Sequence, residues 1–347
     1  MYKQILRPLL FSLNPETAHN LTFLGLKCLR YIPFAKALVR MTCRKNDPAL
    51  EREVFGLKFR NPVGLAGGLD KNGEFYNDFG NFGFGFVEIG SLTPEPQPGN
   101  PKPRLFRVVK DRAIINRMGI NNKGVKYAVE QLKRHRPEVL VAANISKNTN
   151  SINEDAAKDY ESAFALLYDF VDMFVVNISC PNVTGLSDLQ DVSYLSDIVD
   201  KLLDLRMYFD EYRPILIKVS PDISHQQLDE IIDYALMSGV DGIVAGNTTR
   251  TRDGLTLPQE KIDEIGNGGM SGAPLFGKSL SLVRYISEKS KGKLPIIGVG
   301  GIMSSEQAQQ MLDAGASLVE IYSGFIYEGP SLVKNINRYI LKRLGRQ

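Results

Sequence analysis

The stretch Val175-Val176-Asn177-Ile178-Ser179-Cys180-Pro181-Asn182 joins an apolar strand to a group of polar and reactive side chains. Its valines and its isoleucine predict a short buried strand, which Pro181 ends. The thiol of Cys180 and the amides of Asn177 and Asn182 gather at the carboxyl end of that strand, where a parallel barrel presents side chains to its pocket. A free cysteine is more often simply buried. Two amides so near one thiol favour a functional site.

Apolar runs of strand length recur along most of the chain, with amphipathic helical stretches between them. The runs lie near 62–67, 84–91, 139–145, 172–179, 214–220, 240–246, 295–301 and 318–323, and the helical stretches include 122–136, 155–170, 224–238 and 304–314. Apolar strands that alternate with such helices are typical of a parallel sheet covered by helices. They predict an α/β fold, a closed (β/α)8 TIM barrel, with an open Rossmann-like sheet as the second alternative. A small hairpin at 54–59, turning at Gly56, is expected to cover one end of the barrel.

Residues 1–45 form an N-terminal helical extension to the barrel of residues 46–347. One helix is expected up to Leu13, and a second after Pro15, with Asn14 as its cap and apolar residues continuing to Met41. These apolar residues cover more than one face, and basic residues far outnumber the single acidic one, Glu16. Basic amphipathic segments of this kind lie in a membrane interface. A helical pair that only docks on the barrel is an equally good alternative.

Composition narrows the class of protein. Hydrophobic residues make up 43% and charged residues 23% of the 347 residues, as in ordinary globular proteins. A net charge of +3, without a basic-aromatic pattern, does not indicate nucleic-acid binding. Three cysteines and three histidines are too scattered for a disulfide framework or a zinc site, so we expect a reducing compartment and no metal. No apolar run reaches the roughly 18 residues needed to span a bilayer, and no signal peptide is evident.

Polar residues or glycines follow every predicted strand at its carboxyl end. This pattern predicts a pocket at that end of the barrel. Gly298-Val299-Gly300-Gly301-Ile302 precedes a helix with Ser304 as its expected cap, and Tyr322-Ser323-Gly324 follows the last strand. Glycine backbones let N–H groups approach a phosphate, and these two loops together favour a phosphorylated ligand. The chain carries neither a Walker lysine motif nor a G-x-G-x-x-G that opens a first βα unit, which argues against nucleoside triphosphates and dinucleotides.

Two lysines lie near this pocket. Lys218 ends an apolar strand and needs an anion nearby, because a buried charge is costly without one. It could be a Schiff-base nucleophile, a group that holds negative charge on a reduced flavin, or a structural ion-pair partner. Lys71, beside Asp70, leaves the same alternatives open. With the amides of several asparagines, Lys71 would suit a small anionic ring, and Cys180 would then transfer a proton, since thiols have a reference pKa near ~8.5.

The motifs resemble those of the dihydroorotate dehydrogenase family over about residues 5 to 340. They are Asn61-Pro62-Val63-Gly64-Leu65-Ala66-Gly67-Gly68-Leu69-Asp70-Lys71-Asn72-Gly73, Thr93-Pro94 with the segment 96–107, Asn116-Arg117-Met118-Gly119, Asn177-Ile178-Ser179-Cys180-Pro181-Asn182 and Ile321-Tyr322-Ser323-Gly324. The N-terminal helices and the segment 96–107 resemble class 2, the membrane-associated and quinone-using branch. This resemblance implies an FMN enzyme that oxidises dihydroorotate to orotate in pyrimidine synthesis, peripherally bound at the cytoplasmic face of the cell membrane. Residues 1–45 would then give a membrane quinone its access.

The resemblance also implies roles for individual residues. Cys180 would be the catalytic base. FMN would contact Ala66, Gly67, Gly68, Leu69, Asp70, Lys71, Ser91, Asn144, Asn177, Lys218, Gly246, Gly272, Gly301, Tyr322 and Ser323. The substrate would contact Lys71, Asn116, Arg117, Met118, Gly119, Ile120, Asn177, Asn182, Asn247 and Thr248. His19, Arg107 and Tyr322 would lie near the quinone path.

Three positions depart from the class 2 pattern. Cys180 stands where class 2 members have serine and is the choice of class 1, Ser91 stands where threonine is common, and Ile120 stands where phenylalanine is common. The nearest alternative function is a soluble class 1 enzyme that uses fumarate or an NAD-linked partner. An NAD-linked form would need an iron–sulfur partner subunit, since this chain has no cysteine cluster. A phosphate-ligand-binding or membrane-docking protein without turnover is the alternative outside enzymes.

Overall fold

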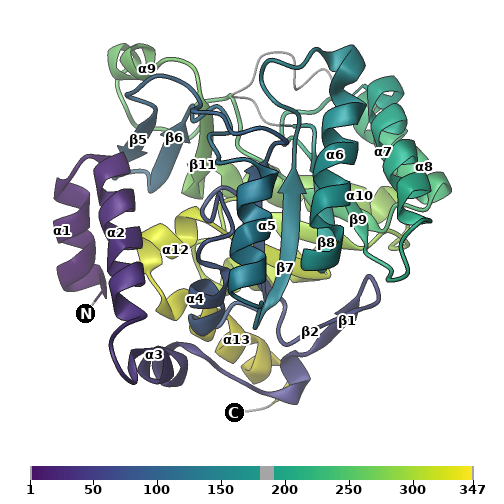
Figure 1. Cartoon of the computed structure of the whole chain (residues 1–347). Helices are drawn as coiled ribbons and strands as arrows, with labels where there is room; N and C mark the ends of the chain where they lie inside the picture. The colour runs from purple at the N-terminus through teal and green to yellow at the C-terminus, as the bar shows by residue number, and fades with distance from the viewer. Residues whose placement is uncertain (1, 180–190, 346–347) are drawn as a thin grey trace.

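The structure, a computed structural model, describes residues 2–179 and 191–345. Its centre is a closed barrel of eight parallel strands that follow one another in chain order (Figure 1). The strands are β3 (Val63–Leu65), β4 (Phe86–Leu92), β7 (Leu140–Ile145), β8 (Met173–Asn177), β9 (Ile215–Val219), β10 (Gly242–Ala245), β12 (Ile296–Val299) and β13 (Leu318–Ile321). Each strand overlaps one of the predicted apolar runs, so the predicted (β/α)8 barrel is confirmed.

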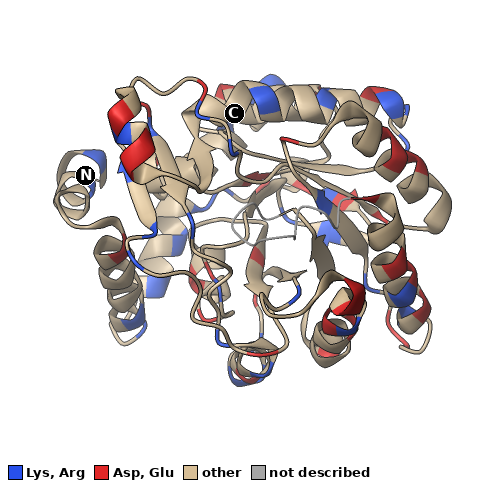
Figure 2. Cartoon of the chain, turned by 90° about the horizontal axis from the view of Figure 1, so that it is seen from above, with Lys and Arg blue, Asp and Glu red and all other residues tan. Residues whose placement is uncertain are grey.

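Helices surround the barrel and cover the outward faces of its strands (Figure 1). They are α4 (Tyr76–Asn81), α5 (Val125–Arg134), α6 (Ala156–Leu167), α7 (Val192–Arg206), α8 (His225–Ser238), α10 (Phe276–Lys289), α11 (Ser305–Asp313), α12 (Ser323–Glu328) and α13 (Ser331–Arg343). A further helix, α9 (Gln259–Ile265), lies apart from the barrel strands, at the top of the molecule in Figure 1. The helices after β4, β7, β9 and β12 match the predicted helical stretches. Viewed from above, both signs of charge are mixed over these outer helices (Figure 2). Burying apolar strand faces under them accounts for the continuous apolar character of the strands.

The barrel interior is filled by side chains at its amino-terminal end. The ring of Phe86 on β4 is fully buried there. Gly64 on β3 makes this possible, because a Cβ at that position would overlap the ring. The predicted hairpin, β1 (Arg52–Val54) and β2 (Leu57–Phe59), places Phe59 edge-on against Phe86 at a centroid distance of 5.3 Å. The amino-terminal end is therefore plugged, and a ligand can enter only from the carboxyl ends of the strands.

A second, antiparallel sheet lies over that carboxyl-terminal end. It contains β5 (Leu105–Val108), β6 (Ala113–Asn116) and β11 (Gly269–Gly272), with β6 in the middle. These strands belong to the loops that follow β4 and β10, and such loops emerge at the carboxyl end of a parallel barrel. The sequence prediction did not include this sheet. It carries Asn116 and Gly272, both expected site residues.

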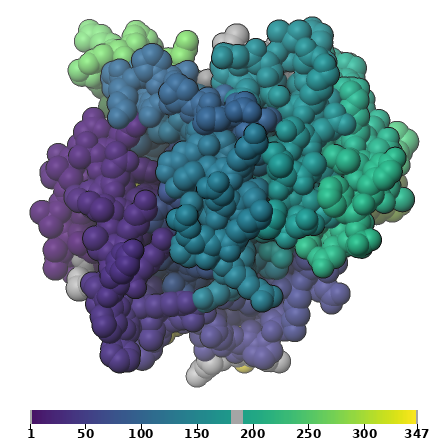
Figure 3. All heavy atoms as spheres, in the orientation of Figure 1, coloured from purple at the N-terminus to yellow at the C-terminus, as the bar shows by residue number. Residues whose placement is uncertain are grey.

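The N-terminal extension consists of α1 (Arg7–Ser12), α2 (Pro15–Leu29) and α3 (Ala35–Cys43), after a helical turn at Tyr2–Leu6. Asn14 caps α2, as predicted, by accepting a hydrogen bond from the Glu16 N–H at 3.0 Å. The expectation of one helix continuing to Met41 is wrong, because the chain turns at Phe34, whose φ is +62°. These helices form one side of the molecule (purple in Figure 3). Within the described residues, no helix has the length and apolar character that crossing a bilayer requires.

Candidate active site

A cavity of about 500 Å³ opens at the carboxyl end of the barrel. The strand ends form its floor, and its walls come from β6, β11 and α2. The size is within the range of pockets that enclose a small ligand or cofactor. All fifteen residues expected to contact FMN line this cavity: Ala66, Gly67, Gly68, Leu69, Asp70, Lys71, Ser91, Asn144, Asn177, Lys218, Gly246, Gly272, Gly301, Tyr322 and Ser323.

Most of the residues expected to contact substrate line the same cavity: Lys71, Asn116, Met118, Gly119, Ile120, Asn177, Asn247 and Thr248. Arg117 is not among them. Its guanidinium donates to the carbonyls of Ile265 and Asn267 and lies 4.7 Å from the centroid of the Phe106 ring. Cys180 and Asn182 lie outside the described residues.

Glycines bring the backbone close to the cavity at two points. Gly301 has a φ of +73°, and an added Cβ would lie 2.5 Å from the Cα of Phe276, the first residue of α10. At Gly67 an added Cβ would lie 3.0 Å from the carboxyl carbon of Glu88. Side chains are therefore excluded from both points, and the exposed backbone can approach a ligand directly. This arrangement fits a phosphate at the first point and a flat ring over the second.

The amides on the floor each donate a hydrogen bond to another polar side chain of the protein. Asn177 donates to Ser91 Oγ at 2.8 Å, and Asn247 donates to Ser179 Oγ at 2.9 Å. Asn144 donates to Glu88 at 2.6 Å, while its Oδ1 is buried and accepts no hydrogen bond from a described residue. A buried acceptor without a donor is costly. A ring N–H group in the cavity would satisfy it, so this acceptor on the floor fits a flavin ring.

Lys218 enters the floor from β9. Its Nζ lies 2.7 Å from Glu88 Oε1, and both side chains are almost fully buried. The two residues come from β9 and β4, which β7 and β8 separate around the barrel, so the ion pair joins two strands that are not neighbours through the barrel interior. The pair supplies the anion that the sequence required for this lysine. It also places a cation directly beneath the cavity.

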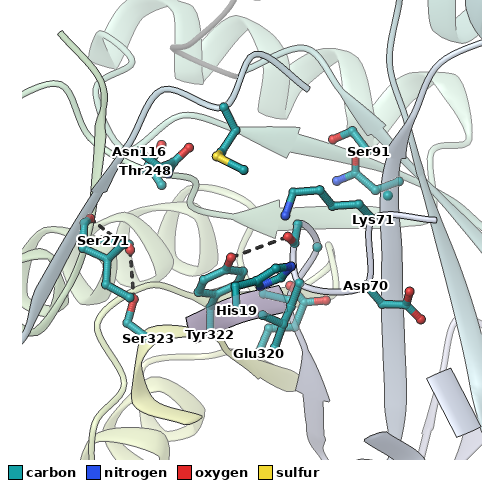
Figure 4. Close-up of a pocket in the computed structure, with 18 of the residues that line it drawn as sticks. His19, Asp70, Lys71, Ser91, Asn116, Thr248, Ser271, Glu320, Tyr322 and Ser323 are labelled. Carbon is teal, nitrogen blue, oxygen red and sulfur yellow. Dashed lines mark hydrogen bonds between the residues drawn. The ribbon is translucent and has the colours of Figure 1, made fainter. Parts of the chain in front are cut away.

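Lys71 and Asp70 are adjacent but differ in direction. Lys71 extends into the cavity, whereas Asp70 points away from it (Figure 4). Asp70 accepts hydrogen bonds from the N–H groups of Glu74 and Phe75, both at 2.8 Å, and so fixes the loop after β3. Burial raises the pKa of Asp70 to about 6 despite these bonds. Burial, aided by the positive charge of Arg104, lowers the pKa of Lys71 to about 8.

The outer wall of the cavity comes from α2. His19 packs against Phe23 at a centroid distance of 4.3 Å and faces the cavity near Tyr322 (Figure 4). Burial and the nearby Lys71 ammonium lower the pKa of His19 to about 3, so its imidazole is neutral at physiological pH. Arg107, also expected here, instead stacks 4.5 Å from the centroid of the Phe11 ring and donates to carbonyls at the end of α1.

Two carboxyl groups on the floor were not singled out in the sequence. Glu88 and Glu320 are both fully buried, and Glu320 lines the cavity. The signal that identified Lys218, a charged residue inside an apolar strand, is also present at both glutamates. Ser271 on β11 was missed as well. It shares a 2.8 Å hydrogen bond with Ser323 at the cavity wall.

Comparison with known proteins agrees with this geometry. A family model described as dihydroorotate dehydrogenase matches residues 49–344. The chain is 48% identical over 343 residues to the dihydroorotate dehydrogenase (quinone) of Christiangramia forsetii, with 99% of each chain covered. It is 45% identical over 352 residues to the protein of that name from Coxiella burnetii, covering 100% of this chain and 98% of that one.

A solved structure of the Eimeria tenella dihydroorotate dehydrogenase in complex with ferulenol is also similar. Its TM-score is 0.86 at 33% identity, with 95% of this chain and 92% of that chain covered. The similarity to the Christiangramia forsetii protein covers 99% of this chain and so extends over the N-terminal helices as well as the barrel. The chain therefore belongs to the dihydroorotate dehydrogenase family and, within it, to the quinone-dependent class 2.

Proposed function

We propose that the chain oxidises (S)-dihydroorotate to orotate and passes the electrons through FMN to a membrane quinone, in de novo pyrimidine (UMP) biosynthesis. One observation carries the proposal: a single cavity is lined by the floor amides, the glycine backbones, Lys218 and α2. The family implies a flavin, and FMN is the form whose single phosphate suits the backbone around Gly301. When bound, FMN supplies the acceptor for the hydride that leaves C6 of dihydroorotate.

The protein's own groups bind and orient the substrate. The ammonium of Lys71 attracts the substrate carboxylate, and the amides of Asn116, Asn177 and Asn247 offer donors and acceptors to the carbonyl and N–H edges of its ring. We assign removal of the C5 proton to the thiol of Cys180, on sequence grounds. A thiol is a far stronger acid than a serine hydroxyl and supplies a base at lower pH. Activity of a Cys180→Ser variant should depend more steeply on alkaline pH, and coincident pH–rate profiles would refute the assignment.

Residues 1–45 are proposed as the membrane-association and quinone-access segment of the FMN-binding barrel, residues 46–347. Large apolar side chains are exposed on this segment, with Tyr31 at 87% and Phe34 at 88% exposure between α2 and α3. Basic residues flank them, which suits an anionic lipid surface. On the inner side of α2, Phe23 and Leu24 line the cavity. A quinone from the membrane would therefore reach the cavity between α2 and the barrel, and the protein would bind peripherally at the cytoplasmic face of the cell membrane.

Turnover of the purified protein tests the proposal. We expect a yellow protein that reduces a short-chain quinone with dihydroorotate as donor, faster with detergent or lipid than without. Turnover with fumarate and not with quinone would identify a class 1 enzyme instead. A colourless protein that binds no FMN would indicate a binding protein without turnover.

Substitutions on the helices test the membrane claim separately. Tyr31→Ser with Phe34→Ser should lower liposome binding and turnover with a liposome-embedded quinone, while turnover with a soluble dye remains. The matched control is Met207→Ser with Tyr208→Ser, which removes side chains that are 82% and 85% exposed after α7. Equal loss in both double variants would contradict a membrane role for the N-terminal segment.

A further inference from the structure

The floor of the barrel holds more negative than positive charge. The carboxyl groups of Glu88 and Glu320 come from β4 and β13, and the one ammonium among them is that of Lys218. All three side chains are at most 6% exposed. Moving charges out of water is costly unless they are paired. One cation can balance one carboxylate, so the second carboxyl needs another means of neutralisation.

The hydrogen bonds of the two carboxyl groups indicate how the second one is neutralised. Glu88 uses Oε1 alone to accept from Lys218 at 2.7 Å and from Asn144 at 2.6 Å. Its Oε2, and both oxygens of Glu320, are buried and receive no donor from any described residue. The two carboxyl groups nevertheless lie within hydrogen-bonding reach of each other. Two carboxylates cannot bond to each other, whereas a carboxylic acid and a carboxylate can.

We propose that Glu320 carries a proton at neutral pH and donates it to Glu88, so that an acid–carboxylate pair fixes Lys218 beneath the flavin site. Glu320 is then a positioning residue: its donor occupies one oxygen of Glu88 and leaves the other for Lys218 and Asn144. The cluster as a whole is electrically neutral. This inference deepens the proposed function, on which its link to the flavin rests.

The surroundings support the proton. Burial and then the negative charge of Glu88 raise the pKa of Glu320 well above its ordinary value of 4.5, and Lys218 lowers it by less. No other charged group among the described residues acts on Glu320. Tyr322, two residues after Glu320 and just beyond the end of β13, is neutral because burial raises its pKa to about 12. Apolar residues complete the interior on the neighbouring strands, including Val299 on β12 and Ala66 after β3.

Infrared spectroscopy of the flavin-loaded protein tests the proton directly. In protein labelled with carbon-13 glutamate, at a pH well above the value of about 6 for Asp70, we expect one carboxylic-acid carbonyl band that shifts with the label. The band should vanish in Glu320→Gln. It should also vanish in Glu88→Gln, since Glu320 then becomes the counter-ion of Lys218 and ionises. Glu328→Gln is the control: Glu328 is an ion-pair partner of Lys3 and Arg112 and contributes nothing to the band, so the band should remain unchanged in this variant.

Each other outcome overturns the proposal. A wild-type spectrum without the band means that both carboxyls are ionised, and a band that survives in Glu320→Gln belongs to another residue. A band that survives in Glu88→Gln means that burial alone protonates Glu320. This measurement needs no turnover, so it can fail while the dehydrogenase activity stands, and the reverse also holds.

A rescue series tests the positioning role. Glutamine keeps a donor for Glu88, so Glu320→Gln should retain kcat within about twofold. Glu320→Met removes the donor and leaves Oε2 of Glu88 unsatisfied, which should lower kcat or flavin affinity roughly tenfold. Equal losses in the two variants would refute the role of the donor. The pH dependence of stability gives a second readout. As the pH rises from about 4.5 toward neutrality, the denaturant concentration at the midpoint of unfolding should fall more for the wild type than for Glu320→Gln. The reason is that only the wild-type chain releases this proton when it unfolds.

Discussion

Replacing Lys218 by methionine should be among the most damaging single changes in the barrel. Methionine is close to lysine in volume and leaves the charge of Glu88 without its cation. Removing one partner of a buried ion pair costs about 3–5 kcal/mol. Solvent cannot screen the loss, because the two side chains are 6% and 0% exposed.

A double-mutant cycle made in the Glu320→Gln background, where no second carboxyl can replace Glu88 as the partner of Lys218, isolates the pair from other effects. Urea unfolding of Lys218→Met, Glu88→Gln and the combined variant gives the coupling free energy, which should exceed about 2 kcal/mol and favour the combined variant over Lys218→Met. Measurements with and without added FMN separate lost flavin affinity from lost stability, since a bound ligand adds to apparent stability.

The surface supplies the control. Lys201 pairs with Asp197 at 2.9 Å along α7, with side chains 45% and 53% exposed, and Lys201→Met should not change stability measurably. A coupling below about 1 kcal/mol for Lys218 and Glu88 would put the pair in the same class as that surface bridge. The cation beneath the cavity would then have to be held by something other than Glu88.

Three further changes test other parts of the site. Lys71, with a pKa of about 8, loses its charge above that pH. The KM for dihydroorotate should therefore rise above pH 8 by up to about tenfold per pH unit, and Lys71→Gln should show a high KM that does not rise with pH. Asp70 releases its proton near pH 3.8 when unfolded and near 6 when folded, so stability should fall as pH rises between these values; parallel stability curves for wild type and Asp70→Asn would contradict this. Gly301→Ala places a Cβ 2.5 Å from the Cα of Phe276 at a residue with a left-handed φ. It should lower the free energy of unfolding by about 1–3 kcal/mol and lower the flavin-to-protein absorbance ratio. Unchanged FMN affinity would argue against a phosphate site at this backbone.

The strands of the barrel could be predicted because each is buried on both faces and is therefore apolar throughout. The hairpin at its amino-terminal end could also be predicted, since Gly56 marks the turn. The antiparallel sheet was not. Its strands are only four residues long, and β11 pairs with β6 across more than 150 residues of chain, a distance that no local pattern spans. The break between α2 and α3 was hidden because apolar residues continue on both sides of Phe34.

Residue types at the strand ends predicted a pocket, but only the fold could say which side chains share it. Arg117 belongs to the same motif as Asn116, yet one extra residue along the strand direction turns it toward Phe106. Asp70 and Lys71 likewise separate into a loop-fixing carboxylate and a cavity cation. Such choices depend on packing partners that lie far away in sequence.

The geometry of Lys218 also decides among the three roles that its sequence left open. A Schiff-base nucleophile must be a neutral amine, whereas a carboxylate oxygen at 2.7 Å in a buried site stabilises the ammonium. That leaves a structural ion pair and a cation for the reduced flavin, and these are not exclusive. Glu88 holds the ammonium within the barrel interior, and the Lys218 side chain also lines the cavity. If Glu320 is neutral, the cluster adds no net negative charge beneath the ring, and the ammonium stays free to offset charge that develops above it. The ion pair that stabilises the barrel is thus also what keeps its floor suited to an electron-accepting cofactor.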